Sequence, residues 1–433
     1  MTELSYENDG VSDEAIGDPW GISDETRDAL ADRLGRARQS VIDGHSSGNL
    51  GFLGLPDANP SGLTAWAHRK REGRWTDAVV IGIGGSSLGT EAIFQSADSS
   101  QLDGLNLHFS SNIDPRSVDR LLDTVPLDTT LFIVVTKSGT TVETMSQFAI
   151  IFERLVDQLG SGRAAAQIIA VTSPDSGELR SLADRHGFES FDIPPNVGGR
   201  FSVLTPVGLV PLALAGYPIQ ELLDGAASMR DRFLERDPEN NAILRAAGDI
   251  FSLYQRGMQE LVLMNYADDL EGLGEWFRQL IGESLAKAEN RRADTVHAGI
   301  TPIAATGAVD QHSQVQLFME GPDRRLVIFG GLDTFDADIE IPDHALPERL
   351  NHLAGHSLAD VMDAERTATR EALQEAGRPT AELMLPDLRP ASIGAFVIFW
   401  ESATAILGEL LDIDAFNQPG VERGKRIAHE KLL

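Results

Sequence analysis

The sequence predicts an α/β protein of two domains, each with a parallel β-sheet between layers of helices. Strand-like apolar runs alternate with helical stretches twice along the chain, as in βαβ units. Runs such as 78–83 are apolar without alternation, which is typical of strands buried on both faces. The 433 residues suffice for two domains, and a helix-forming stretch without strand signals, 219–259, separates the two halves.

The first half begins with acidic, polar residues through Asp18-Pro19-Trp20, so we expect an exposed or frayed N-terminus. A helix follows, which Asp24 can cap and in which Leu30, Leu34 and Val41 recur at helical spacing. The strands expected after it are Ala78–Ile83, Leu105–Ser110, Thr130–Thr136, Gln167–Thr172 and Ser190–Ile193.

The second half repeats this alternation. The expected strands are Leu261–Asn265, Ile300–Ala304, Arg325–Phe329 and Ala381–Leu385. Helices are expected over 272–287, from Asp310 onward, and over 392–411. Two more are expected over 347–353 and 358–374, separated by a break at Gly355. The resulting boundaries are an N-terminal extension and helix over 1–47, a first domain over 48–218, a second over 219–415, and a loop with a helical tail over 416–433.

Composition excludes several classes of function. A net charge of −30 disfavours nucleic acid and anionic membranes as partners, and we see no run long enough to cross a bilayer. With no cysteine and no secretion signal, the expected location is the cytoplasm. Only five of the 36 basic residues are lysines, and this acidic, lysine-poor composition favours a halophilic host over a merely acidic soluble protein.

The first candidate functional segment follows the strand that ends near Ile81. It reads Gly-Ile-Gly-Gly-Ser-Ser-Leu-Gly and leads into a helix. Glycines let the backbone approach a ligand, and the N–H groups of a helix N-terminus attract anions. The segment is typical of a phosphate-binding turn and equally of a tight structural corner. A dinucleotide site is disfavoured because Ser87 stands where the fingerprint requires glycine.

The second segment, Thr136-Lys137-Ser138-Gly139-Thr140-Thr141, also joins a buried strand to a helix. Its four hydroxyls, one ammonium and helix N-terminus supply the donors that a monophosphate needs. A Ser/Thr helix cap with an incidental lysine is the alternative. Ligands of parallel sheets bind at the carboxyl ends of the strands, so we expect both segments to face one crevice.

Two further segments carry charged groups. In Gly198-Gly199-Arg200 the glycines allow a tight bend that places a permanent cation, suited either to a developing oxyanion or to an ordinary salt bridge. On the helix over 272–287, Gln279, Glu283 and Lys287 are spaced to form one polar stripe, which is also common on solvated helices. Gly282 costs that helix about 1 kcal/mol relative to alanine and suggests close approach by another element.

The last two segments contain His312 and Lys425. We expect His312 in the first turn of a helix, as a proton donor or acceptor or merely as a cap. No second histidine lies within a turn of it, which disfavours a metal site. Lys425 follows the loop Asn417-Gln418-Pro419-Gly420, and a lysine kept in a lysine-poor chain suggests proton transfer, although a solvated helix-start lysine is equally consistent.

These segments, in this order from Gly82 to Lys425, resemble the glucose-6-phosphate isomerase (phosphoglucose isomerase) family. The resemblance rests on Gly-Ile-Gly-Gly-Ser-Ser-Leu-Gly, Lys-Ser-Gly-Thr-Thr, Gly-Gly-Arg-Phe-Ser-Val, Gln-x-x-Gly-Glu-Ser-x-x-Lys, Asp-Gln-His-Ser-Gln and Phe-Asn-Gln-Pro-Gly-Val-Glu-x-Gly-Lys. It implies two sugar-isomerase (SIS) domains, each a three-layer α/β/α sandwich, with an N-terminal helix and a C-terminal helical tail. It also implies a homodimer that uses neither metal nor cofactor.

The resemblance implies that the chain is an intramolecular oxidoreductase of glycolysis and gluconeogenesis, which interconverts glucose 6-phosphate and fructose 6-phosphate through a cis-enediol. Glu283 would be the base and Arg200 would stabilise the enediolate. His312, from the neighbouring subunit, and Lys425 would open and close the sugar ring. The residues expected around the substrate and its phosphate are Gly85, Ser86, Thr136, Lys137, Ser138, Thr140, Thr141, Gln279 and Gln418.

Two positions depart from the family pattern. Thr136 stands where serine is usual, which keeps the hydroxyl and adds a methyl group. The stretch Glu289–Asp294 looks longer than in bacterial relatives, which leaves the path of residues 288–300 open. The alternative functions are a non-catalytic SIS-type sugar-phosphate sensor and an isomerase of another phosphosugar, such as mannose 6-phosphate. A nucleotide-dependent dehydrogenase is a weaker third.

Overall fold

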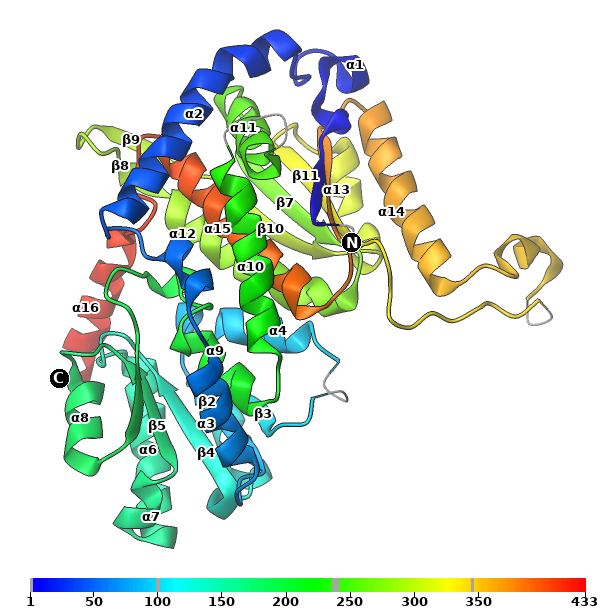
Figure 1. The fold of residues 1–433 in the computed structure, drawn as a ribbon. Coiled ribbons are helices and arrows are strands. Elements are labelled where there is room, and N and C mark those ends of the chain that lie inside the picture. Colours follow the sequence, from blue (N-terminus) through cyan, green and yellow to red (C-terminus); the bar gives the residue numbers. More distant parts are fainter. Residues whose placement is uncertain (1–2, 99–101, 236–240, 344–345) are drawn as a thin grey trace. The chain divides into compact units, whose positions relative to one another are not determined.

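The computed structural model describes residues 3–98, 102–235, 241–343 and 346–433. The chain divides into two compact units, one formed by Asp43–Ser228 and the other by Met1–Ile42 with Met229–Leu433. Both divisions fall inside helices, the first in α2 (Asp24–Ser46) and the second in α10 (Ile219–Leu234). Each unit contains one five-stranded sheet (Figure 1).

The unit formed by Asp43–Ser228 has an all-parallel sheet in the order β3-β2-β4-β5-β6. Every residue of β2, β4 and β5 is buried, as their unbroken apolar runs predicted. All five strands expected in this half of the chain are present. Their bounds are β2 (Asp77–Ile81), β3 (Asn106–Ser110), β4 (Thr130–Val135), β5 (Ile168–Thr172) and β6 (Glu189–Asp192).

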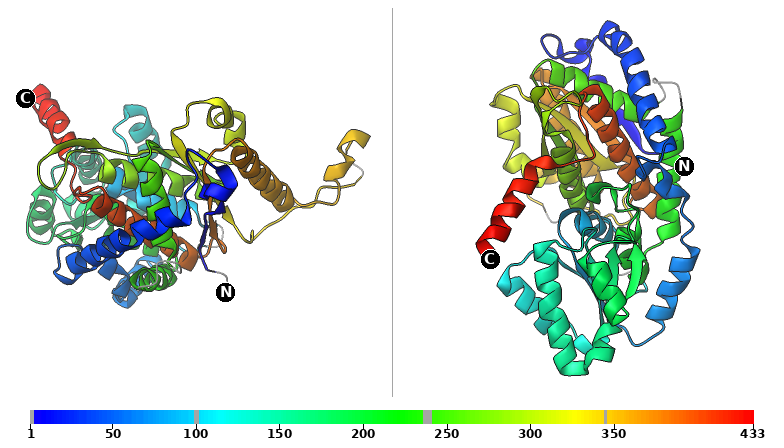
Figure 2. Two further views of the ribbon diagram at one scale, coloured as in Figure 1. Left: turned by 90° about the horizontal axis from the view of Figure 1, so that it is seen from above. Right: turned by 90° about the vertical axis from the view of Figure 1, so that its left-hand side faces the viewer.

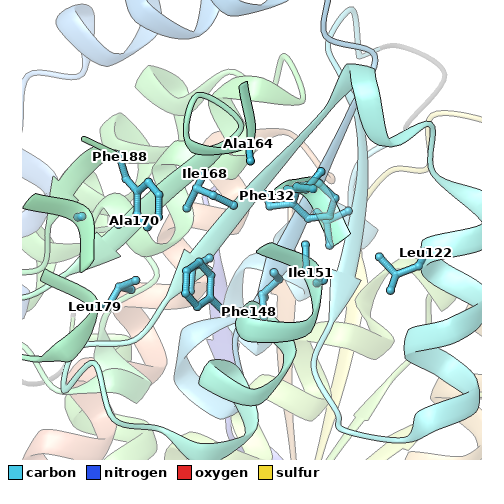
Figure 3. Close-up of a cluster of buried hydrophobic side chains, with 14 of the residues drawn as sticks. Leu122, Phe132, Phe148, Ile151, Ala164, Ile168, Ala170, Leu179 and Phe188 are labelled. Atoms are coloured by element: carbon cyan, nitrogen blue, oxygen red, sulfur yellow. The ribbon is translucent and has the colours of Figure 1, made fainter. Parts of the chain in front are cut away.

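Helices cover both faces of this sheet. On one face Phe132 and Ile168 pack against Phe148, Ile151 and Leu179 from the helices that follow β4 and β5 (Figure 3). That face is covered by α5 (Pro115–Thr124), α6 (Val142–Leu159), α7 (Ser161–Ala165) and α8 (Glu178–His186). The other layer contains α3 (Ser61–Arg71), α4 (Leu88–Gln95) and α9 (Pro206–Leu214). The short helical turns of this unit are η2 (Phe52–Asp57), η3 (Gly84–Ser86), η5 (Leu127–Thr129) and η6 (Gly199–Phe201).

The other unit has a sheet in the order β1-β12-β11-β7-β10. Its four expected strands are parallel, and β1 adds to the edge in the antiparallel direction. The bounds are β1 (Ser5–Glu7), β7 (Glu260–Asn265), β10 (Thr301–Thr306), β11 (Arg325–Leu332) and β12 (Thr380–Leu385). Phe318 of α13 (Val315–Glu320) and Leu373 of α14 (Leu358–Glu375) pack on one face. The remaining core helices are α11 (Ala242–Gln255), α12 (Glu271–Leu285) and α15 (Pro390–Leu410).

The N-terminus corrects one prediction. Residues 5–7 form β1, with Tyr6 paired to Leu383 and fully buried, and Val11 is also fully buried. The prediction of an exposed or frayed start is wrong here, because pairing with the sheet edge satisfies the backbone hydrogen-bonding groups of residues 5–7. Local composition does not reveal such a distant pairing partner. The next elements are η1 (Asp9–Val11) and α1 (Asp13–Ile16), and α2 is capped by Ser23, whose hydroxyl accepts from Thr26 N, rather than by Asp24.

Helix α15 corrects a second prediction. By length and composition it is able to cross a membrane, whereas no such run was expected from the sequence. In the structure, 94% of its apolar window is buried inside the protein, and Phe396 and Trp400 pack against Trp276 and Phe277 of α12. Its composition is that of a core helix surrounded by other elements of its own unit.

The remaining elements lie at the periphery of the same unit. A two-stranded hairpin, β8 (Lys287–Glu289) and β9 (Thr295–Ala298), contains the stretch whose path the sequence left open. The segment between β11 and α14 runs out from the sheet and includes η9 (Glu348–Leu353), and the break expected at Gly355 has a φ of +79° (Figures 1 and 2). Two short helical turns, η7 (Asp268–Leu270) and η8 (Val309–His312), lie earlier in the same unit. Its last elements are η10 (Pro419–Val421) and α16 (Glu422–Leu432). The α/β class with parallel sheets and helical ends is thereby confirmed.

Candidate active site

Two polar loops leave the same edge of the β2–β6 sheet. The turn η3 follows β2, and the loop 136–141 follows β4. Strands β2 and β4 are parallel neighbours with Ile81 opposite Val134. Both loops therefore lie at the carboxyl ends of adjacent strands, where parallel sheets bind ligands.

The turn η3 is packed directly against η6, the turn that carries Arg200. A Cβ atom added to Gly85 would lie 2.3 Å from the carbonyl carbon of Gly199 and 2.7 Å from the nitrogen of Arg200. Ser202 Oγ donates to Gly199 O at 2.6 Å and also lies 3.3 Å from Gly85 O. The two glycine-rich segments thus meet backbone to backbone, and Arg200, only 2% exposed, is held beside Gly85 and Ser86.

The hydroxyls of the loop 136–141 are hydrogen-bonded to one another. Thr136 Oγ1 and Thr141 Oγ1 are 2.9 Å apart, and Thr136 Oγ1 also accepts from Gly139 N at 3.2 Å. Ser138 Oγ accepts from both the nitrogen and the hydroxyl of Thr140. Thr136 is buried, whereas Ser138 and Thr140 are exposed. The loop therefore has a fixed shape and keeps hydroxyls at the surface, where they are able to bind an anion.

The ammonium of Lys137 is directed to the backbone that precedes Arg200. Its Nζ donates to Pro195 O at 2.9 Å and to Val197 O at 2.8 Å. Partial burial lowers the pKa of Lys137 from its ordinary value because the charged form loses hydration. Lys137 is therefore bonded to the loop leading to Gly198, Gly199 and Arg200.

In the other unit, Glu283 and Gln279 lie together on α12. Gln279 Nε2 donates to Glu283 Oε1 at 3.1 Å, as their spacing of four residues predicted. Both side chains are half-buried, and Gln279 Oε1 is buried without a hydrogen-bond partner among the described residues. The carboxylate of Glu283 thus has a defined orientation and a polar neighbour with an unused acceptor.

Lys287 and Gly282 behave differently from the sequence predictions. Helix α12 ends at Leu285, so Lys287 lies in β8 and does not extend the stripe of Gln279 and Glu283. Its Nζ turns back and donates to Glu283 O at 2.8 Å and Ser284 O at 2.7 Å, satisfying carbonyls that the helix end leaves open. A Cβ at Gly282 would make only ordinary contact with Pro302, at 3.6 Å, so no close approach requires this glycine.

His312 is exposed at the last position of η8, so the prediction that it occupies the first turn of a helix is wrong. The chain makes a tight turn here before α13 starts at Val315, because Asp310 side-chain oxygens accept from Thr306 N and from Ser313 Oγ. The neighbouring Gln311 donates to Tyr266 Oη and Thr369 Oγ1, both at 2.8 Å. The turn that presents His312 is thus anchored to Tyr266, directly after β7, and to Thr369 of α14.

Lys425 and Gln418 lie on exposed segments near the C-terminus. Lys425 Nζ is 2.8 Å from Glu422 Oε1, one turn earlier on α16, and its side chain is 65% exposed. Gln418 is exposed directly before η10. In the described part of the chain, neither Lys425 nor His312 forms a hydrogen bond or ion pair with Glu283.

Within each unit the structure brings together part of the predicted set: Gly85 and Ser86 with Arg200, the hydroxyls of 136–141, and Gln279 with Glu283. Sequence reasoning missed the supporting roles of Ser202 and Gln311, although both belong to the motifs that were singled out. Their side chains are ordinary for their positions, and only the contacts identify what they support. Among the described residues, no group of three His, Asp or Glu side chains is arranged to hold a metal ion.

Comparison with known proteins gives a consistent result. Residues 64–432 match the family model described as phosphoglucose isomerase. A glucose-6-phosphate isomerase from Carboxydothermus hydrogenoformans is 40% identical, over 94% of this chain and 89% of that protein. A probable glucose-6-phosphate isomerase from Natronomonas pharaonis is 35% identical, over 95% and 92% of the two chains. The crystal structure of a hypothetical protein from Thermus thermophilus has a TM-score of 0.88 at 34% identity, covering 99% of both chains.

The family model matches most of the chain. The matched range of this chain contains the glycine-rich turn, the hydroxyl loop, Arg200, Glu283, His312 and Lys425. The relatives match over nearly their whole length. The chain therefore belongs to the phosphoglucose isomerase family.

Proposed function

We propose that Glu283 moves the proton between C1 and C2 when this chain interconverts glucose 6-phosphate and fructose 6-phosphate. The observation that carries the proposal is the half-buried carboxylate of Glu283, oriented by Gln279 on a helix whose last turn is capped. A carbon-bound proton next to a carbonyl is weakly acidic, so its removal needs a base held in place and a cation for the enediolate. Arg200, a permanent and buried cation, supplies that charge.

The phosphate is assigned to the loops of the β2–β6 sheet. Ser86, Ser138, Thr140 and Thr141 offer hydroxyls at the carboxyl ends of the strands, which are able to donate to an anion. Gly85 lets the turn that carries Ser86 pack against the turn of Arg200. Thr136 supports this loop through Thr141. Gln418 and the loop around it are assigned to the sugar, as the family resemblance implies.

His312 and Lys425 are assigned to opening and closing the sugar ring. Both are exposed in a single chain, and neither has a hydrogen bond or ion pair to Glu283 within the described ranges. This agrees with a homodimer in which His312 serves the site of the neighbouring subunit. Such a dimer predicts mixed-variant complementation, because a chain lacking His312 and a chain lacking Glu283 would restore one intact site together.

The variant Glu283→Gln tests the assignment of the base. We expect loss of isomerisation in a coupled dehydrogenase assay started with fructose 6-phosphate, while calorimetry still detects substrate binding, because the amide keeps the shape and loses the basicity. Glu275→Gln is the matched control, since Glu275 lies on the same helix and pairs with Arg278. Near-normal turnover in Glu283→Gln would reject the assignment.

Two alternatives are separated by the same assays. A SIS-type sugar-phosphate sensor would bind fructose 6-phosphate without turnover in the native chain. An isomerase of broader specificity would also turn over mannose 6-phosphate, which a panel of hexose and pentose phosphates would reveal. The assembly of a base, an arginine, a histidine and a lysine favours catalysis over sensing.

The net charge of −30 and the scarcity of lysine favour a cytoplasm with molar salt. Screening shortens to about 3 Å at 1 M salt, which removes the repulsion between surface carboxylates. We expect the thermal midpoint to rise between about 0.1 M and 3 M KCl. An unchanged midpoint over that range would reject a halophilic host.

A further inference from the structure

Two lysines of this lysine-poor chain have their ammonium groups bonded to backbone carbonyls. One binds the carbonyl of Glu283 itself, and the other binds the loop that leads to Arg200. Lys287 binds the carbonyls of Glu283 and Ser284, at 2.8 and 2.7 Å. Lys137 binds the carbonyls of Pro195 and Val197, at 2.9 and 2.8 Å. The two contacts lie in different units and are independent observations.

The contact of Lys287 fixes the last turn of α12. The final carbonyls of a helix have no partner within the helix, and a cation there also interacts favourably with the helix dipole. Lys287 is only 7% exposed, so water cannot readily replace its ammonium. One of the two bonded carbonyls belongs to Glu283 itself, so the backbone of the proposed base is held directly.

The contact of Lys137 fixes the approach to Arg200. The bonded carbonyls lie five and three residues before Arg200, separated from it by Gly198 and Gly199. Glycines permit many backbone conformations, so this approach needs an external restraint. The loop is also tied by Gly51 N, which donates to Asn196 O at 3.1 Å, and by the packing of Gly199 on Gly85.

Arginine also binds paired backbone carbonyls in this chain, as Arg378 Nη2 does with Met319 O and Gly321 O, but a guanidinium needs more room than an ammonium. An ammonium is a compact point charge whose donors rotate to two converging carbonyls, whereas a guanidinium is planar and wider. The chain contains 36 lysines and arginines, of which only five are lysines. Two of those five, Lys137 and Lys287, each donate to two backbone carbonyls.

We propose that Lys137 and Lys287 are positioning residues, each clamping through two backbone carbonyls the segment that places Arg200 or Glu283 for proton transfer. The inference rests on the proposed function of those two residues. It gives Lys137 a task other than an ion pair with the substrate phosphate.

The test compares four variants, Lys287→Met, Lys287→Arg, Lys137→Met and Lys137→Arg, with the native chain. A displacement of about 1 Å in a catalytic group lowers turnover by about a hundredfold, so we expect kcat to fall by about tenfold to a hundredfold in each. KM for fructose 6-phosphate should stay within about threefold of native, because the phosphate-binding hydroxyls are unchanged. Lys431→Arg, on the exposed surface of α16, is the control for exchanging lysine with arginine.

Two destabilised control variants test for a purely structural role. They are Leu253→Ala in α11 and Leu155→Ala in α6, which remove buried side chains outside the motifs described above. They should lower the thermal midpoint at least as much as the lysine variants and keep native kcat at temperatures below the midpoint. Arginine variants retain the charge and serve where the methionine variants fail to fold.

Three results would overturn the inference. The first is native kcat in folded Lys287→Arg and Lys137→Arg. The second is a raised KM with unchanged kcat in Lys137→Met, which would make Lys137 a phosphate ligand. The third is an equal loss of kcat in the leucine controls. Failure of the proposed function is distinct, because then the native chain lacks isomerase activity or Glu283→Gln retains it.

Discussion

Alanine at position 85 should disable the enzyme by pushing two backbone turns apart. The added Cβ would lie 2.3 Å from the carbonyl carbon of Gly199, 2.4 Å from its oxygen and 2.7 Å from the nitrogen of Arg200. All three atoms are backbone, so no side-chain rotation relieves the overlap. Ordinary contact begins near 3.4 Å, so the turns must separate by about 1.1 Å, the difference between 3.4 and 2.3.

That separation gives an expected magnitude for the loss of activity. A shift of about 1 Å in a catalytic group costs about a hundredfold in rate, or about 2.7 kcal/mol of transition-state stabilisation. The overlap also costs about 1–3 kcal/mol of folding free energy, which a large domain tolerates. We therefore expect Gly85→Ala to fold and to lose about two orders of magnitude in kcat/KM.

The assay is the coupled conversion of fructose 6-phosphate, with circular dichroism to verify folding. Gly62→Ala is the matched control, because a Cβ there meets no atom of the described residues within 4 Å and the position is helical. It should retain native activity and gain slightly in stability. If Gly85→Ala keeps kcat/KM within about twofold of native, the reasoning that this contact places Arg200 is refuted.

Three further outcomes are expected. Asp249 lines a cavity with Arg27 and Arg245, and burial raises its pKa to about 6. Because the folded state binds the proton of this carboxyl more tightly than the unfolded state, the contribution of Asp249 to folding stability is fully present below about pH 4. That contribution is lost as the pH rises through 6. In the native chain this group lowers the free energy of unfolding by about 3 kcal/mol between about pH 4 and pH 7, and Asp249→Asn should remove that pH dependence. Urea unfolding of both proteins at several pH values measures the difference, and an identical pH dependence would contradict the expectation. Glu401 is fully buried, its carboxylate has no hydrogen-bond partner in the part of the chain that the structure describes, and burial raises its pKa. Glu401→Met should therefore raise the free energy of unfolding by about 1–3 kcal/mol, and a lowered thermal midpoint would argue against it. Gln311→Leu should slow turnover by releasing the turn that presents His312, with native substrate affinity; native kcat would show that this anchor is dispensable.

The strands and the polar loops after them were predictable because their signals are local. An unbroken apolar run such as Thr130–Val135 suits only a strand covered on both faces, and the hydroxyls that follow it mark its carboxyl end. The pairing of Gln279 with Glu283 follows from helical spacing alone. The motif order likewise indicated the isomerase family before any contact was known.

Other features depend on partners distant in the chain. Residues 5–7 are strand only because the edge of β12 is there to pair with them, and α15 is a core helix only because α11 and α12 surround it. Thus the sequence by itself determined the strand order along the chain, and it indicated the loops proposed to bind phosphate and the residue types of the proposed catalytic set. Only the tertiary structure decided that Gly85 supports the turn of Arg200 and that Lys137 and Lys287 hold backbone carbonyls. Periodicity and composition report how a residue relates to its neighbours in the chain, whereas a hydrogen bond across 60 residues depends on how the whole domain closes.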